Sequence, residues 1–142
     1  MEKTIGKSIS ILNHLLVQKL NNLLYCQKTG ITSDQFRLLT FLWEKDGISQ
    51  QILVNLLSRD KASIARMVDL LEDTGILTRI SDKTDKRVNL IYLTKKGKQL
   101  KFQAIFCAQS CNNMILNNFN ENEKTEFERL ILKAIYNLVK AD

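Results

Sequence analysis

The sequence has no proline and few glycines, which narrows the range of folds. None of its 142 residues is proline, and only five are glycine. Because proline breaks helices and glycine weakens them, this composition favours long uninterrupted helices over a β-sandwich or a disordered chain. A chain of this length can bury a sizeable core as one domain without disulfides or metal.

Residue types that carry catalysis are also scarce. His14 is the only histidine, and the sequence contains no glycine-rich phosphate loop, nucleophile elbow or cluster of metal ligands. We therefore predict that the protein is not an enzyme. We expect no catalytic residues, no cofactor and no metal site.

Long hydrophobic runs and regularly spaced cysteines are missing as well. No run of about eighteen apolar residues is present to span a bilayer, and the amino terminus lacks the apolar block of a signal peptide. Cys26, Cys107 and Cys111 are an odd number without metal-ligand spacing. We expect a cytoplasmic protein without membrane contact, whose thiols are reduced, buried and unreactive.

The most informative stretch is a short helix followed by a second one with two distinct faces. Asp60 is a good N-cap for the second helix, and Gly75 is a good residue to end it. Apolar residues at three- and four-residue spacing predict one buried face, made by Ile64, Met67, Val68 and Leu71. The opposite face carries small residues and one long cation, which suits the major groove of DNA: Ala62, Ala65 and Arg66, with Asp69 and flanking Lys61 and Ser63.

A basic hairpin is predicted next. The β-branched runs 76–81 and 88–94 are joined by the polar turn 82–87. Between residues 74 and 98, seven Lys and Arg stand against two acids, a local balance of +5 in a chain of net charge +6. Together with an overall pI near 9.3, this concentration of charge indicates a polyanionic partner.

Long amphipathic helices are predicted at both ends of the chain. Their apolar stripes are wider than one neighbouring element covers, which predicts a twofold homodimer. Capping residues place further helix starts at Thr32, Ser49, Thr94 and Asn120. The predicted fold class is mainly α with a small β-hairpin wing, built as a winged helix-turn-helix lobe plus a helical dimerisation lobe.

The order and spacing of four short segments identify a family. They are SIAR at 63–66, LEDTGILTR at 71–79, DKR at 85–87 and LTKKG at 93–97. With the flanking helices, they make nearly the whole chain resemble the MarR family of bacterial transcription regulators. The resemblance implies a single domain at 1–142, with a DNA-binding lobe at 31–94 and a dimerisation region at 1–30 and 95–142. It also implies a homodimer on a pseudo-palindromic operator in double-stranded DNA.

The resemblance also assigns roles to individual residues. Arg87 matches the wing arginine that in this family typically reaches the minor groove, and Asp85 matches the aspartate that holds it. From the predicted helix face, Arg66 can donate two hydrogen bonds to guanine. The full set of predicted DNA-binding residues is Ser49, Gln50, Lys61, Ala62, Ser63, Ala65, Arg66, Lys83, Asp85, Lys86 and Arg87.

What the regulator senses is less defined by the sequence. Relatives often bind small lipophilic or aromatic anions, so the resemblance implies a repressor that such an effector releases from DNA. We place the effector site beside His14, Tyr25 and Trp43. Two alternatives stay open: a winged-helix module that binds protein without touching DNA, and a regulator that senses oxidation through a cysteine.

Overall fold

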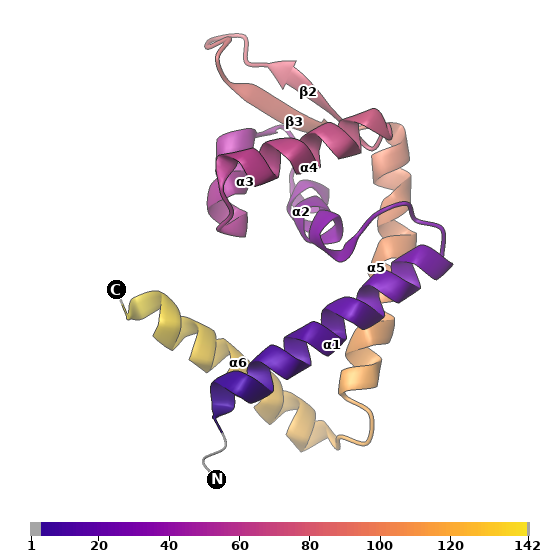
Figure 1. The fold of residues 1–142 in the computed structure, drawn as a ribbon, viewed down its shortest axis with the longest axis vertical. Helices are drawn as coiled ribbons and strands as arrows, with labels where there is room; N and C mark the ends of the chain where they lie inside the picture. Colours follow the sequence, from indigo (N-terminus) through magenta and orange to yellow (C-terminus); the bar gives the residue numbers. More distant parts are fainter. Residues whose placement is uncertain (1–3, 142) are drawn as a thin grey trace. The chain divides into compact units, whose positions relative to one another are not determined.

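The structure is a computed structural model that describes residues 4–141. Within these residues, six helices and a small antiparallel sheet confirm the predicted fold class (Figure 1). The elements follow in the order α1 (Ile5–Cys26), α2 (Ser33–Glu44), β1 (Ile48–Ser49), α3 (Gln50–Leu57), α4 (Lys61–Asp73), β2 (Leu77–Ser81), β3 (Asn89–Leu93), α5 (Lys95–Ile115) and α6 (Glu121–Lys140). The chain divides into two compact units, one ending at Ala108 and the other beginning at Gln109. Among the described helices, none combines the length and apolar character that crossing a membrane requires.

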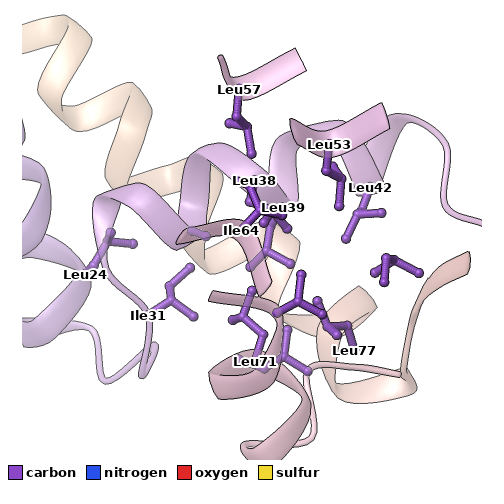
Figure 2. Close-up of a cluster of buried hydrophobic side chains, with 14 of the residues drawn as sticks. Leu24, Ile31, Leu38, Leu39, Leu42, Leu53, Leu57, Ile64, Leu71 and Leu77 are labelled. Atoms are coloured by element: carbon purple, nitrogen blue, oxygen red, sulfur yellow. The ribbon is translucent and has the colours of Figure 1, made fainter. Parts of the chain in front are cut away.

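A cluster of leucine and isoleucine side chains joins α2, α3 and α4 in the first unit. Figure 2 shows these side chains pointing toward one another from the three helices. Leu38, Leu53 and Ile64, one from each helix, are 0% exposed. Since full burial of one such side chain contributes about 1.5–3 kcal/mol, the cluster holds the helix-turn-helix together. The predicted buried face of α4 is confirmed, with Met67 only partly buried.

Side-chain caps begin the helices of this lobe where the sequence predicts them. The Thr32 hydroxyl accepts the Gln35 N–H at 3.2 Å, and the Gln35 side chain accepts the Thr32 N–H at 3.0 Å. Ser49 caps α3 by accepting the Ile52 N–H at 3.2 Å. Asp60 caps α4 in the same way. Each cap satisfies an amide that would otherwise lack a partner within the helix.

The sheet contains the predicted hairpin and one strand that was not predicted. Its order is β1-β3-β2, and all pairs are antiparallel. In the hairpin, Leu77 pairs with Leu93 and Arg79 with Ile91. The additional strand β1 has two residues and pairs Ile48 with Ile91. It was missed because two residues are too few to show an alternating pattern.

At the base of the hairpin, the end of α4 meets the start of α5. Gly75 takes a φ of +76°, and the Ile76 N–H donates to the Leu71 carbonyl at 2.9 Å, so the predicted helix end is confirmed. The predicted cap at Thr94 is also confirmed, because its hydroxyl accepts the Gly97 N–H at 3.1 Å. The same hydroxyl lies 2.5 Å from the Gly75 carbonyl, to which it donates.

One prediction about α3 is wrong in part. The spacing of its four large apolar residues, Ile52, Leu53, Leu56 and Leu57, predicts that all of them face inward. Leu53 and Leu57 are buried, whereas Ile52 and Leu56 are 45% and 44% exposed. A helix of eight residues buries only the narrow stripe that meets the core, so the flanking apolar residues stay accessible.

The second unit consists of the end of α5 and all of α6. The predicted capping box is confirmed, since Asn120 and Glu123 exchange hydrogen bonds of 2.8 and 3.0 Å. The rings of Phe119 and Phe127 meet edge to face at 5.5 Å. None of the residues of α6, all of which are described, is buried. Its exposed large apolar residues are Leu130, Ile131, Leu132, Ile135, Tyr136, Leu138 and Val139.

The first helix also leaves much of its apolar surface uncovered. Leu24 near its carboxyl end is fully buried, and it is the one buried residue of α1. Toward the amino end the large apolar side chains are exposed: Ile5, Ile9, Ile11, Leu12, Leu15 and Val17. Large exposed apolar patches of this kind are typical of interaction surfaces.

We predict that Gly97→Ala destabilises the fold by more than about 2 kcal/mol. A Cβ at this position would lie 2.1 Å from the Ile76 carbonyl oxygen, so the start of α5 would have to move away from the hairpin base. Urea unfolding measures the change. Gly6→Ala is the control, because no atom lies within 4 Å of a Cβ there, and alanine in a helix is favoured by about 0.5 kcal/mol. Equal stability of Gly97→Ala and the parent would contradict the prediction.

Candidate nucleic-acid interface

The outward face of α4 carries the residues that the sequence places in the major groove. Lys61, Ala62 and Arg66 are exposed, and Ser63 and Ala65 are partly exposed. In Figure 1, α4 runs beside the β2–β3 hairpin, whose connecting loop projects past the helices. The small residues let the backbone come close to a ligand surface, and the two cations supply hydrogen-bond donors.

A chain of hydrogen bonds links the cap of α4 to its exposed arginine. Asp60 accepts the Ser63 N–H at 2.8 Å and the Ser63 hydroxyl at 2.7 Å. The Ser63 oxygen in turn accepts a guanidinium N–H of Arg66 at 3.3 Å. The hydrogen bonds from Ser63 hold the pKa of Asp60 below its usual value. Asp60 therefore stays ionised at neutral pH and keeps Ser63, and through it Arg66, in a defined position.

The loop of the hairpin contains an exposed arginine held by an ion pair. The Arg87 side chain is 90% exposed, and its Nε and Nη2 donate to the two oxygens of Asp85 at 3.0 and 3.1 Å. This bidentate pair lowers the pKa of Asp85 and raises that of Arg87. Lys83 and Lys86 are exposed in the same loop. The structure thus brings together the four residues predicted for the wing.

Residues from β1, α3, α4 and the hairpin surround a hollow beside α4. Its volume is about 260 Å³. Ser49 ends β1 and caps α3, Gln50 begins α3, Lys61 begins α4, and Arg87 comes from the hairpin loop. The remaining residues around it are Gln51, Val54, Val88 and Asn89. Four of the residues predicted to bind DNA therefore converge on one concave surface.

Arg79 is the residue of this region whose role the sequence did not indicate. Its side chain is 21% exposed and lies 2.6 Å from Asp69 and 3.3 Å from Glu72, both on α4. It also donates to the Ala65 carbonyl and to the Gln50 side chain, each at 3.2 Å. Two carboxylates therefore compensate its charge, which is one of the seven positive charges counted between residues 74 and 98.

A signal for this role was present in the strand pattern. Arg79 follows Leu77 by two residues, so both side chains point to the same face of β2. Leu77 is buried, and Ile91 opposite Arg79 is buried too. A cation on the inner face of a strand needs an acidic partner, and Asp69 and Glu72 are two acids spaced to lie on one side of the preceding helix.

The structure does not bring the three predicted effector residues together. His14 is exposed on α1. Tyr25, 84% exposed, lines a hollow of about 800 Å³ with Cys26, Lys28, Ile31 and others near the end of α1 and the start of α2. Trp43 lines a different hollow and donates its ring N–H to the Gly97 carbonyl at 3.0 Å. The grouping of these residues in a single pocket is therefore not found in the described chain.

The three cysteines differ in accessibility. Cys107 and Cys111 on α5 are buried, as expected. Cys26, at the end of α1, is exposed, so the expectation of burial was wrong for this residue. Burial raises the pKa of the Cys111 thiol above its usual value, which keeps it protonated at neutral pH. In the described residues, no three His, Cys, Asp or Glu side chains are placed to hold a metal ion.

Comparison with known proteins shows which family and which individual proteins the chain is similar to. The model of the MarR family matches residues 31–88. The transcriptional regulator HosA of Escherichia coli O157:H7 is 28% identical over 105 residues, which are 74% of this chain and 78% of HosA. An uncharacterised regulator of the helix-turn-helix type from Bacillus subtilis, YdgJ, is 35% identical over 71 residues, which are 50% of this chain and 43% of YdgJ.

Solved structures resemble the whole chain. A MarR transcriptional regulator from Methanosarcina mazei Go1 superposes with a TM-score of 0.91 at 29% identity, covering 99% of this chain and 100% of its own. A cysteine-to-serine mutant of MarR from E. coli, solved with operator DNA, superposes with a TM-score of 0.82 at 27% identity, covering 92% of each chain.

We predict that a thiol reagent such as DTNB modifies Cys26 rapidly and the other two cysteines only after unfolding. Reaction requires access and a thiolate, and burial denies both to Cys111. The absorbance of released thiolate gives the number of fast-reacting thiols. Cys26→Ser should remove the fast phase, and a fast phase that persists in this variant would refute the assignment.

Proposed function

The chain belongs to the MarR family of transcriptional regulators, and on that basis we propose that it binds double-stranded DNA at a specific sequence. The observation that carries the proposal is the convergence of α4, the start of α3 and the hairpin loop on one surface rich in donors. Lys61 and Arg87 border the same hollow from different elements. Such a surface can contact both the bases and the backbone of a duplex.

In this proposal the helix and the wing read different grooves. The face of α4 with Ala62, Ala65 and Arg66 enters the major groove, where Arg66 donates to a guanine. Arg87, held by Asp85, reaches into a minor groove, whose negative potential is strongest in narrow A·T-rich tracts. The remaining predicted residues, Ser49, Gln50, Lys61, Ser63, Lys83 and Lys86, donate to phosphates or support these contacts.

A winged helix that binds protein remains the rival for this surface. It has less reason to place Lys83, Lys86 and Arg87 at exposed positions of one hairpin loop and to hold the arginine there by an ion pair with Asp85. The loop aspartates also serve the turn itself, since Asp82 accepts the Thr84 N–H and Asp85 the Arg87 N–H, each at 3.0 Å. The exposed lysines beside them are thus presented to a polyanion.

The proposed regulator is a twofold homodimer. Both α1 and α6 expose long apolar faces, and within the described chain α6 buries none of its side chains. A second copy of the same chain is the partner that these faces fit, because closed twofold pairing covers identical surfaces on both molecules at once. Two copies of α4 would then meet two half-sites of a pseudo-palindromic operator about one helical turn apart.

The proposed mode of regulation is repression relieved by a small lipophilic or aromatic anion. The hollow beside Tyr25 supports it, since an aromatic ring, the cation Lys28 and the apolar Ile31 border one space of about 800 Å³. Release requires only that the effector bind the DNA-free conformation better by a few kcal/mol. Titrating aromatic carboxylates into the protein bound to labelled operator tests this, and no release from any of them would count against it.

We predict that the full-length protein prefers an operator over a scrambled duplex by about 10³-fold or more. A duplex selected from a random library by the purified protein serves as operator, and fluorescence anisotropy at several salt concentrations measures affinity. Arg66→Ala should cost about 1–3 kcal/mol and relax base preference at one position. Lys86→Ala is the matched comparison: it should weaken all sequences alike and reduce the salt slope by about one.

Two results would contradict this proposal. Equal affinity for the selected and scrambled duplexes would mean that the protein does not read sequence. Uniform weakening by both variants would mean that Arg66 contacts phosphate instead of a base.

We predict that Ile135→Glu shifts the protein from dimer to monomer. It places a charge in the exposed apolar face of α6, and burying an unpaired charge in an interface is costly. Light scattering coupled to gel filtration measures the mass. Lys133→Glu introduces the same side chain on the polar face of the same helix, and this control variant should remain dimeric. A monomeric parent protein at working concentration would refute the dimer.

A further inference from the structure

Arg79 joins three elements through one side chain. Its backbone belongs to β2, and the Glu72 carboxylate of α4 accepts both its backbone N–H at 3.0 Å and its side-chain Nη1 at 3.3 Å. Nη1 also lies 2.6 Å from Asp69, and Nη2 donates to the Ala65 carbonyl. Nε donates to the side-chain oxygen of Gln50 at the start of α3. Every nitrogen of the guanidinium thus has a partner inside the protein.

These contacts distinguish Arg79 from the arginines that face outward. Arg87 has one acidic partner and is 90% exposed, and Arg66 is exposed on α4. Arg79 is mostly covered and sits between two carboxylates, so its charge is already compensated. A group in this state has little left to offer a phosphate, although its partner Gln50 borders the hollow of the candidate interface.

The bond to Gln50 has a directional effect. A glutamine amide has one accepting oxygen and two donating N–H groups. Because the oxygen receives the Arg79 Nε–H, the NH₂ group is the part left to point elsewhere. Gln50 borders the hollow that Lys61 and Arg87 also line. Arg79 therefore sets Gln50 with its donors available for a DNA phosphate.

We propose that Arg79 is a positioning residue for DNA binding: it contacts no nucleic acid, fixes the hairpin against α4 and orients the amide of Gln50. This inference rests on the proposed function. A rigid tie between the two elements matters because α4 and the Arg87 loop must reach two grooves of one duplex at the same time. A guanidinium is required for it, since only a planar fork can serve Asp69, Glu72, Ala65 and Gln50 together.

The test is Arg79→Lys in the full-length protein. Lysine keeps the positive charge beside Asp69 and Glu72, so the variant should fold, but its single ammonium cannot hold all four partners. We expect the affinity for the selected operator to fall about tenfold or more, the equivalent of one or two charged hydrogen bonds. Arg59→Lys is the matched control: Arg59 forms one ion pair, with Asp34 at 3.4 Å, and should keep its affinity within about twofold.

A double-variant comparison separates positioning from direct contact. If Arg79 acts by placing the wing, adding Arg79→Lys to Arg87→Ala should weaken binding much less than it weakens the parent. Lysine can replace arginine at a simple phosphate contact. An Arg79→Lys affinity within about twofold of the parent, or losses that multiply fully with Arg87→Ala, would therefore overturn the proposal.

Amide hydrogen exchange measured without DNA tests the role of Arg79 separately from DNA binding. Arg79→Lys should speed amide exchange in β2, β3 and the start of α3 and leave exchange in α6 unchanged. Arg59→Lys should leave exchange in β2 and β3 unchanged. Unchanged exchange in the hairpin would overturn the role of Arg79 even if the parent binds its operator. A parent without sequence preference would defeat the proposed function, and the exchange result would still decide whether Arg79 fixes the hairpin.

Discussion

The base of the hairpin is where α4, the two hairpin strands and α5 are held together. Gly97 packs so closely on the Ile76 carbonyl that a side chain does not fit at this position. Thr94 donates its hydroxyl to the Gly75 carbonyl and its backbone N–H to the Ile76 carbonyl. The end of α4, both hairpin strands and the start of α5 meet at this point. This contact fixes the end of the hairpin that lies next to α4 and α5.

A second tie acts farther along the hairpin. At the base, hydrogen bonds to the backbone hold the hairpin, whereas Arg79 fixes the strand to α4 through charged side chains. Beyond Arg79 the loop depends on its own turn and the Asp85–Arg87 pair. The tip of the hairpin is therefore held by local contacts, and its base and middle by contacts with α4 and α5.

The sequence predicted what local interactions determine. Caps such as Asp60 and Asn120 act over three residues, and the apolar stripe of α4 follows helix geometry, so both are visible in a single segment. The missed features join distant segments. The two-residue strand β1 is defined by its pairing with β3. The role of Arg79 depends on its partners on α3 and α4. Tyr25 and Trp43 border different hollows because of how α1 and α2 pack.

The lack of any buried residue in α6 also bears on how the protein responds to its own abundance. In the proposed homodimer, a second copy covers the apolar face of α6, so folding would be linked to association and the stability of the dimer would rise with protein concentration. At low concentration the proposed dimer would dissociate and leave α6 exposed. Occupancy of a palindromic operator would then rise more steeply than the amount of protein, which would give a threshold without any cooperative contact on the DNA.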